Sequence, residues 1–166
     1  MASRFKFLFL LFAALSFPLE AQHYVVSIDG WPKMGPGPDG KLGAFEFQFL
    51  TVPQPTASAK GTVQDFQFTI QNVGDAVARF TKHALEGSVL KTVLFEPNPA
   101  RNLLVQVPPV VVRLSDVRVT AVKLSLHSFP EALVTLQASK IEMFTPNPTT
   151  GAMQPFRWDI KAGKGM

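Results

Sequence analysis

The residues VQDFQFTI at Val63–Ile70, followed by a helical segment and then by SVLKTVLF at Ser88–Phe95, decide the fold. In the first segment, large apolar residues alternate strictly with polar ones, which is the pattern of a strand with one buried face. The apolar face carries Phe66, Phe68 and Ile70. The second segment is apolar as well and predicts another strand. We therefore expect a strand–helix–strand unit at the centre of the chain.

The segment between these strands predicts the only convincing helix after the N-terminal region. Asp75 is placed to cap it, because a carboxylate can accept hydrogen bonds from the free N–H groups of the first turn. Lys82 and His83 put positive charge in the last turn, and Gly87 can adopt the left-handed conformation that ends a helix. The apolar stripe that we expect to face the core consists of Val77, Phe80, Ala84 and Leu85.

Further apolar runs predict strands on both sides of this unit. They lie at Tyr24–Ile28, Phe45–Phe49, Leu103–Val107, Val110–Ala121, Leu133–Phe144 and Phe156–Lys161. In two of them the apolar alternation slips by one residue, at Ser115-Asp116 and at Ser139-Lys140, so those strands must bulge or bend to keep their apolar side inward. Paired slips favour strands that curl around a barrel. The sequence thus predicts a mainly β protein, a small closed or nearly closed β-barrel of about nine strands with one flanking α-helix.

Composition is consistent with one domain that has a sizeable core. The chain has 166 residues, 46% of them hydrophobic, and fifteen are phenylalanine. The formal charge of +4 neither demands nor excludes an acidic partner. Because there is no cysteine, disulfides, thiolate metal sites and cysteine nucleophiles are excluded.

The N-terminal residues have the pattern of a secretory signal peptide. Arg4 and Lys6 precede an apolar run at Phe7–Phe17. That run has 11 residues, whereas a helix that spans a membrane needs about 20. We therefore expect a signal peptide at 1–21 and a mature domain at 22–166. The expected protein is secreted to the periplasm or the exterior and has no stable membrane anchor.

The sequence offers little catalytic chemistry. His23, His83 and His127 have no metal-ligand spacing, and no carboxylate pair, nucleophile elbow or phosphate-binding loop is present. We therefore expect no catalytic, cofactor or metal site and no enzyme activity. The basic end formed by Arg157, Lys161 and Lys164 is interpreted as a solvated tail rather than as a nucleic-acid patch.

Several motifs resemble the haemolysin-coregulated protein (Hcp) family, the tube proteins of type VI secretion systems. Val63–Thr69, with the helix and strand that follow, resembles the corresponding unit of that family. FRWDIKAGK at Phe156–Lys164 is similar to the family's closing segment, in which Trp-Asp-x-Lys is usual. Ile28–Gly30 is similar to its first strand and turn, and Leu114–Val119 to its long bent strand. Leu133–Pro146 is similar to the strand before its last turn.

This resemblance covers nearly the whole of 24–164 and implies a structural role. In the family, a β-barrel with one flanking helix assembles into hexameric rings, which stack into a tube that carries or chaperones effectors. The implied partners are further copies of the chain and the spike, sheath and effector proteins of type VI secretion, with no nucleic acid and no cofactor. The loop Val52–Gly61 corresponds to the extended loop that contacts the next ring. The ring-stacking residues implied are Thr56, Ala57, Ser58, Ala59 and Lys60.

Two departures from the family pattern keep an alternative open. Arg157 stands where the family commonly has glycine, and tube proteins assemble in the cytosol and are not usually made with a signal peptide. The alternative is an exported single-domain Hcp-like binding or effector protein that acts outside the cytosol and is not part of a tube. A shared fold does not decide between these functions. The third hypothesis, an enzyme, is disfavoured because no catalytic site stands out.

Overall fold

A computed structural model describes residues 24–33, 35, 40–52, 62–71, 74–99, 110–126 and 131–166. Three features predicted from the sequence lie outside these residues: the signal peptide at 1–21, the loop residues Thr56–Lys60 and the strand at Leu103–Val107. Among the described residues, no helix is long and apolar enough to cross a membrane.

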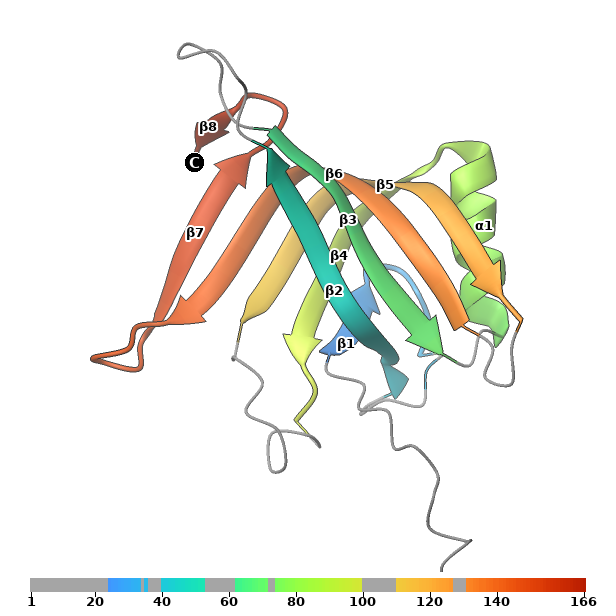
Figure 1. Ribbon diagram of the computed structural model, residues 1–166, viewed down its shortest axis with the longest axis horizontal. Helices are drawn as coiled ribbons and strands as arrows, with labels where there is room; N and C mark the ends of the chain where they lie inside the picture. Colours follow the sequence, from blue (N-terminus) through green and yellow to red (C-terminus); the bar gives the residue numbers. More distant parts are fainter. Residues whose placement is uncertain are drawn as a thin grey trace, which may run out of the picture.

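The described residues form one antiparallel sheet that closes into a barrel (Figure 1). The elements are β1 Tyr24–Ile28, β2 Leu42–Val52, β3 Thr62–Gln71, α1 Gly74–Glu86, β4 Val89–Pro97, β5 Val111–Ser125, β6 Glu131–Pro146, β7 Met153–Asp159 and β8 Lys164–Gly165. The strand order is β3-β2-β1-β4-β5-β6-β7-β8, and a further pairing of β3 with β6 closes a ring of the first six strands. This confirms the predicted small closed β-barrel with a flanking helix. Eight strands lie in the described part of the chain, whereas about nine were expected.

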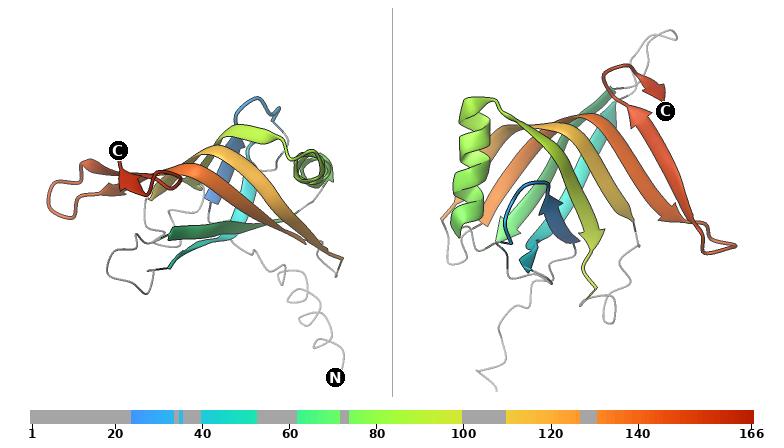
Figure 2. Two further views of the ribbon diagram at one scale, coloured as in Figure 1. Left: turned by 90° about the horizontal axis from the view of Figure 1, so that it is seen from above. Right: turned by 180° about the vertical axis from the view of Figure 1, so that it is seen from behind.

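Strand β6 has two different partners along its length, besides β5. Its first part closes the barrel, because Glu131–Leu136 pairs with Phe66–Gln71 of β3. Its second part leaves β3 and pairs with β7 over Lys140–Pro146. Strands β7 and β8 therefore extend the sheet beyond the closed ring. We call residues 147–166 the wing, and Figure 2 shows it projecting from one side of the barrel.

The barrel interior is filled by aromatic and branched side chains. Phe66, Phe68 and Ile70 of β3 are all at most 1% exposed, as the strict alternation predicts. The ring of Phe68 meets that of Phe95 edge to face, with the centroids 5.1 Å apart. Aromatic pairs in this arrangement add to the stabilisation from burial alone.

Helix α1 begins at Gly74, two residues earlier than a capping role for Asp75 requires. Asp75 lies inside the first turn, and its Oδ2 accepts a hydrogen bond from Arg79 Nε at 2.9 Å. The predicted cap is therefore wrong, and Asp75 forms an i,i+4 ion pair instead. At the other end, Gly87 has φ +63°, which confirms the predicted left-handed end of the helix.

The buried face of α1 differs from the predicted stripe at one position. Phe80 is fully buried, and Val77 and Ala84 pack partly against the core, as expected. Leu85, however, is 84% exposed, and Ala76 is buried instead. With 3.6 residues per turn, Leu85 lies about 140° around the helix from Phe80, whereas Ala76 lies within about 40° of it.

The bend predicted at Ser115-Asp116 is present and runs across three strands. In β5, Leu114 and Val117 are both fully buried although they are three residues apart, and Asp116 between them has φ +52°. In β4, Leu90 pairs with Val117 and Val93 pairs with Leu114. Leu90 and Val93 are both buried although they are three residues apart, so the buried side of β4 changes parity opposite the same point of β5. Strand β6 shifts between the buried residues Leu136 and Ile141, as predicted around Ser139-Lys140.

Because all three strands shift together, their pairing keeps one register on both sides of Asp116, and the β5–β6 register shifts only further along, between Val119 and Ala121. Ser115 pairs with Lys140 and Val117 pairs with Ala138 in the same antiparallel register. The barrel wall can therefore curve without losing its apolar lining.

Candidate functional site

Strand β7 offers a strand edge that is only partly covered. Its inner side pairs with β6, and on its outer side Trp158 and Asp159 pair with β8. The backbone N–H of Met166 also donates to the carbonyl oxygen of Arg157 at 3.3 Å. Within the described part of the chain, Met153–Phe156 pairs with no strand on that side. Such an edge is a template for pairing with another chain.

The face of β7 that continues the barrel interior carries two stacked aromatic rings. Trp158 is opposite Ile141, which is buried in the core, so residues of β7 with the parity of Trp158 share the core side of the sheet. The Phe156 and Trp158 rings stack with centroids 6.4 Å apart and planes at 6°. Trp158 packs partly against the core. Phe156 stays 49% exposed because the wing lies beyond the closed ring.

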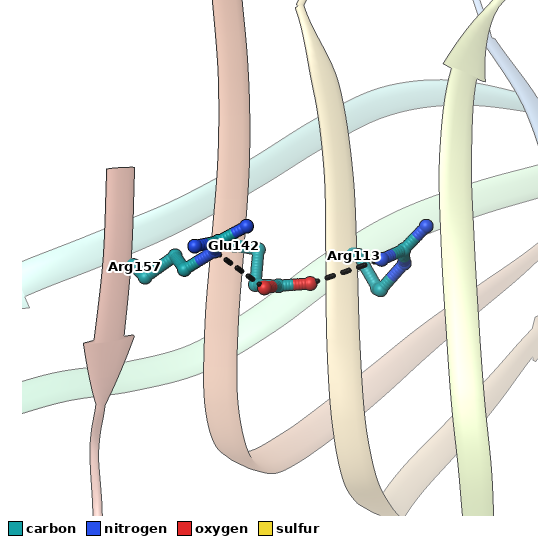
Figure 3. A network of polar contacts seen from close by, with 3 residues as sticks. All are labelled: Arg113, Glu142 and Arg157. Atoms are coloured by element: carbon teal, nitrogen blue, oxygen red, sulfur yellow. Dashed lines mark hydrogen bonds and ion pairs between the residues drawn. The ribbon is translucent and has the colours of Figure 1, made fainter. Parts of the chain in front are cut away.

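The opposite face of the sheet, where the wing joins the barrel, carries a network of one carboxylate and two guanidinium groups (Figure 3). Arg113, Glu142 and Arg157 occupy one row across β5, β6 and β7. Glu142 Oε2 accepts from Arg113 Nη1 at 3.1 Å, and Glu142 Oε1 accepts from Arg157 Nε at 2.9 Å. The Arg113 guanidinium also lies 5.7 Å from the Phe144 ring centroid. These contacts tie the wing to the barrel.

Arg157 therefore does more than the sequence suggested. It was expected in a solvated basic tail, but it belongs to this ion-paired network, and the Glu142 side chain between the two arginines is only 19% exposed. The sequence shows a carboxylate in one strand and arginines in two others. It does not show that strand pairing places them in one row, so sequence analysis missed the network.

A shallow pocket lies beside β1. Its volume is about 200 Å³, and its lining includes Ser27, Trp31, Lys33 and Lys41. The Ser27 hydroxyl is buried without a hydrogen-bond partner among the described atoms. Lys41 Nζ is bound to Glu96 Oε2 at 2.6 Å. The lining residues that the structure describes include no histidine and no carboxylate.

The structure can be compared with the predicted ring-stacking residues and with the three histidines, which were not expected to be ligands. The ring-stacking residues Thr56–Lys60 lie outside the described residues, as do His23 and His127. His83 lies in the last turn of α1, where Nδ1 shares a 2.6 Å hydrogen bond with the Ser88 hydroxyl and the ring stacks on Trp31. In the part of the chain that the structure covers, no group of three His, Asp or Glu residues could hold a metal ion.

Among the residues that the structure describes, Tyr24 has a shifted pKa. Burial raises the pKa of the Tyr24 phenol above its ordinary value, because the ionised form loses hydration. The Tyr24 ring lies 6.3 Å from that of Phe47, so its role is packing in the barrel wall.

Comparison with known proteins was informative at the level of structure. No protein-family model matches the sequence. No curated protein matches it in sequence either. Solved structures do match the fold, with the chain covering nearly all of each of them.

Three of these structures share the fold at low sequence identity. Hcp1 from Salmonella typhimurium has a TM-score of 0.70 and 16% identity, with 87% of this chain and 98% of that chain covered. A structure described as a type six secretion system protein has a TM-score of 0.67 and 13% identity, with 88% and 100% covered. A type VI secretion system effector from Yersinia pestis has a TM-score of 0.63 and 17% identity, with 82% and 98% covered. The chain therefore has the fold of the Hcp proteins of type VI secretion.

Proposed function

We propose that this chain is a structural subunit of type VI secretion that forms homohexameric rings, and that the rings stack into a tube that carries or chaperones effectors. The observation that carries the proposal is the Hcp-like barrel, which matches Hcp1 from Salmonella typhimurium over 98% of that protein's length. The proposed role needs complementary surfaces rather than a catalytic centre. Its partners are other copies of the chain and, in the tube, the spike, sheath and effector proteins.

The wing supports this proposal. A ring of identical subunits needs a surface on each copy that the next copy covers. The wing offers an open strand edge at Met153–Phe156 and the half-exposed ring of Phe156. The ion pairs of Glu142 link Arg157 of the wing to β6 and, through Arg113, to β5. A preorganised surface loses less conformational entropy on association than a flexible one does.

The direct test is the molar mass of the mature domain, 22–166, in solution. Light scattering over a range of concentrations should give roughly six times the monomer mass, because Hcp-type rings are hexameric. Electron microscopy of the same sample should show rings. A strict monomer at every concentration would overturn the ring proposal and favour the alternative function.

That alternative is an exported single-domain Hcp-like protein, and the signal peptide predicted at 1–21 favours it. We propose that the signal peptide is removed and that the mature protein begins at or near Gln22. N-terminal sequencing of protein purified from the native cell, compartment by compartment, tests this. Recovery of the chain from Met1 in the cytosol would remove the argument for export and strengthen the tube proposal.

A further inference from the structure

The pocket beside β1 lies where two strands part. Strands β1 and β2 pair as far as Val26 and Leu42, and beyond that point the remaining residues of β1, Ser27 and Ile28, pair with β4 alone among the described strands. The pocket lies at this point. Its lining combines residues 26–28 of β1 with the turn at 31–33 and with residues 40–42, where β2 begins. A concave site is therefore built into the fold of a single subunit.

A buried hydroxyl group in this lining has no partner. Val26 belongs to the core, so the next residue, Ser27, has its side chain on the outer face of the barrel wall. On that face Val25 is only 2% exposed, and the Ser27 Oγ atom is buried and makes no hydrogen bond to any described atom. Buried hydroxyl groups nearly always have a partner, because leaving one unsatisfied is costly. Ser27 thus offers a hydrogen bond to a polar atom that enters the pocket.

The charged residues that line the pocket are two lysines, Lys33 and Lys41. Glu96 Oε2 binds Lys41 Nζ at 2.6 Å and neutralises it. Lys33 forms no ion pair with any residue in the described part of the chain. Its stem packs on Gly40, where an added Cβ atom would stand 2.6 Å from Lys33 Cβ. The pocket therefore presents one unpaired positive charge, which favours an anionic ligand.

Most of the other lining residues are apolar, and they include one indole ring. Trp31 is packed in place, because its ring stacks on His83 with the centroids 5.7 Å apart and contacts Phe80 at 4.7 Å. Figure 2 shows the segment after β1 beside α1. An aromatic ligand can make offset stacking contacts with an indole ring. The volume of about 200 Å³ is smaller than the 300–1,000 Å³ of sites for drug-sized ligands, so it suits one aromatic ring with a short substituent.

From these features we propose that the pocket binds a small aromatic carboxylate. The ring of the ligand lies against Trp31, and its carboxylate accepts hydrogen bonds from the Ser27 hydroxyl and the Lys33 ammonium group. One hydroxyl and one unpaired ammonium match the single charge of a carboxylate better than the nearly double charge of a phosphate ester. All lining residues belong to one subunit, so this binding goes beyond the proposed assembly role and does not depend on ring formation.

Fluorine NMR of protein produced from the full chain and labelled with fluorotryptophan tests the proposal. The chain has two tryptophans, so Trp31 reports on the pocket and Trp158, on the wing, is an internal control. Phenylacetate should shift the Trp31 resonance saturably and leave that of Trp158 unchanged. The expected Kd is about 0.1–1 mM, because so small a ligand makes few contacts. Phenylethylamine, which has the same ring and a positive charge, should not bind.

Two variants identify the groups that hold the carboxylate. Ser27→Ala removes the buried hydroxyl and should weaken binding about tenfold, because a hydrogen bond to a charged group is lost. Lys33→Gln removes an exposed charge and should weaken binding about threefold. Lys140→Gln is the matched control, because it removes an exposed lysine of β6 that does not line the pocket, and it should bind like the wild type. Thermal unfolding verifies that each variant is folded.

A free aromatic acid and the last residue of a peptide that ends in phenylalanine present the same chemistry. Titration with phenylacetate and with such a peptide distinguishes these sources by which one binds more tightly. Amidation of the peptide terminus should abolish its binding.

Three results would overturn the proposal. If neither phenylacetate nor the peptide shifts the Trp31 resonance saturably, the pocket holds water alone. If phenylethylamine binds as tightly as phenylacetate, the pocket does not select an anion. If Ser27→Ala and Lys33→Gln both bind like the wild type, the shift of Trp31 arises from another site.

Discussion

The rings of Phe68 and Phe80 meet edge to face inside the barrel, with their centroids 5.8 Å apart. Phe68 belongs to β3 and Phe80 to α1, and both side chains are fully buried. The flanking helix thus shares the core of the barrel. The ring of Trp31 also contacts Phe80, with the two ring centroids 4.7 Å apart.

We predict that Phe68→Ala lowers the free energy of unfolding by about 3–5 kcal/mol, because it leaves a large cavity in a fully buried site. Phe156→Ala is the matched control, since it removes the same side chain from a half-exposed position on the wing. In the isolated subunit it should cost less than about 2 kcal/mol. Urea unfolding of both variants measures the difference. Equal losses at the two positions would contradict the assignment of Phe68 to the core.

The alternation of residues predicts which face of a strand is buried only where the sheet covers that face. It succeeds in β3, because Phe68 faces the closed barrel. It predicts the same face for Phe156 in β7, but there the barrel has already closed through β3 and β6, and the ring stays half exposed. Leu85 fails for a related reason, because hydrophobicity suggested an inward side chain while the angle around the helix points it outward.

The bend in β5 could be predicted because it leaves a local signal, a change of parity in one strand. The ion-pair network could not, because Arg113, Glu142 and Arg157 meet only through the register of three strands. Register depends on pairings between residues that are far apart in the sequence. The candidate assembly surface therefore needed the structure, whereas the barrel did not.

The two ion pairs of Glu142 predict a measurable, salt-dependent contribution to stability. Glu142→Gln should lower the free energy of unfolding by about 1 kcal/mol at low salt, because partly exposed pairs contribute a few tenths to one kcal/mol each. The loss should shrink in 1 M salt, where the Debye length falls to about 3 Å. Glu86→Gln is the control, because its pair with Lys82 is longer, at 3.8 Å, and more exposed. A loss at Glu142 that is no larger than that at Glu86 would mean that the network does not hold the wing.

Because the phenol of Tyr24 is partly buried, we predict that the protein loses stability in alkaline solution. Burial raises the pKa of its phenol in the folded state, so above the unfolded pKa of about 10 the unfolded chain loses the proton first. The contribution of Tyr24 to the free energy of unfolding is therefore fully present below about pH 10 and declines as the pH rises through the folded-state pKa. Tyr24→Phe removes this dependence. Urea unfolding between pH 7 and pH 11 gives the free energy of unfolding of both proteins. The wild-type value minus the variant value should be constant up to pH 9 and then fall. Parallel curves up to pH 11 would contradict the prediction.

Deletion of Thr56–Lys60 tests the ring-stacking residues that the family resemblance implies. If these residues contact the next ring, the deletion should shorten or abolish stacks and leave single rings intact, because the barrel and the wing are unchanged. Electron microscopy and sedimentation at high protein concentration distinguish stacks from single rings. Replacement of the five residues by a Gly/Ser segment of the same length separates loss of contacts from shortening of the loop. Stacks of normal length in both variants would exclude this role.

The left-handed backbone of Asp116 predicts opposite effects for two substitutions at one position. With φ at +52°, this residue allows β4, β5 and β6 to shift their buried faces together. Glycine adopts this conformation without a steric penalty, so Asp116→Gly should leave the free energy of unfolding within about 1 kcal/mol of the wild type. Valine is β-branched and clashes there, so Asp116→Val should lower it by about 1–3 kcal/mol. Arg118→Val is the control, because it introduces the same side chain at an exposed neighbouring position of β5. Thermal and urea unfolding of the three variants measure these effects. Equal stability of Asp116→Val and Arg118→Val would contradict this account of the bend.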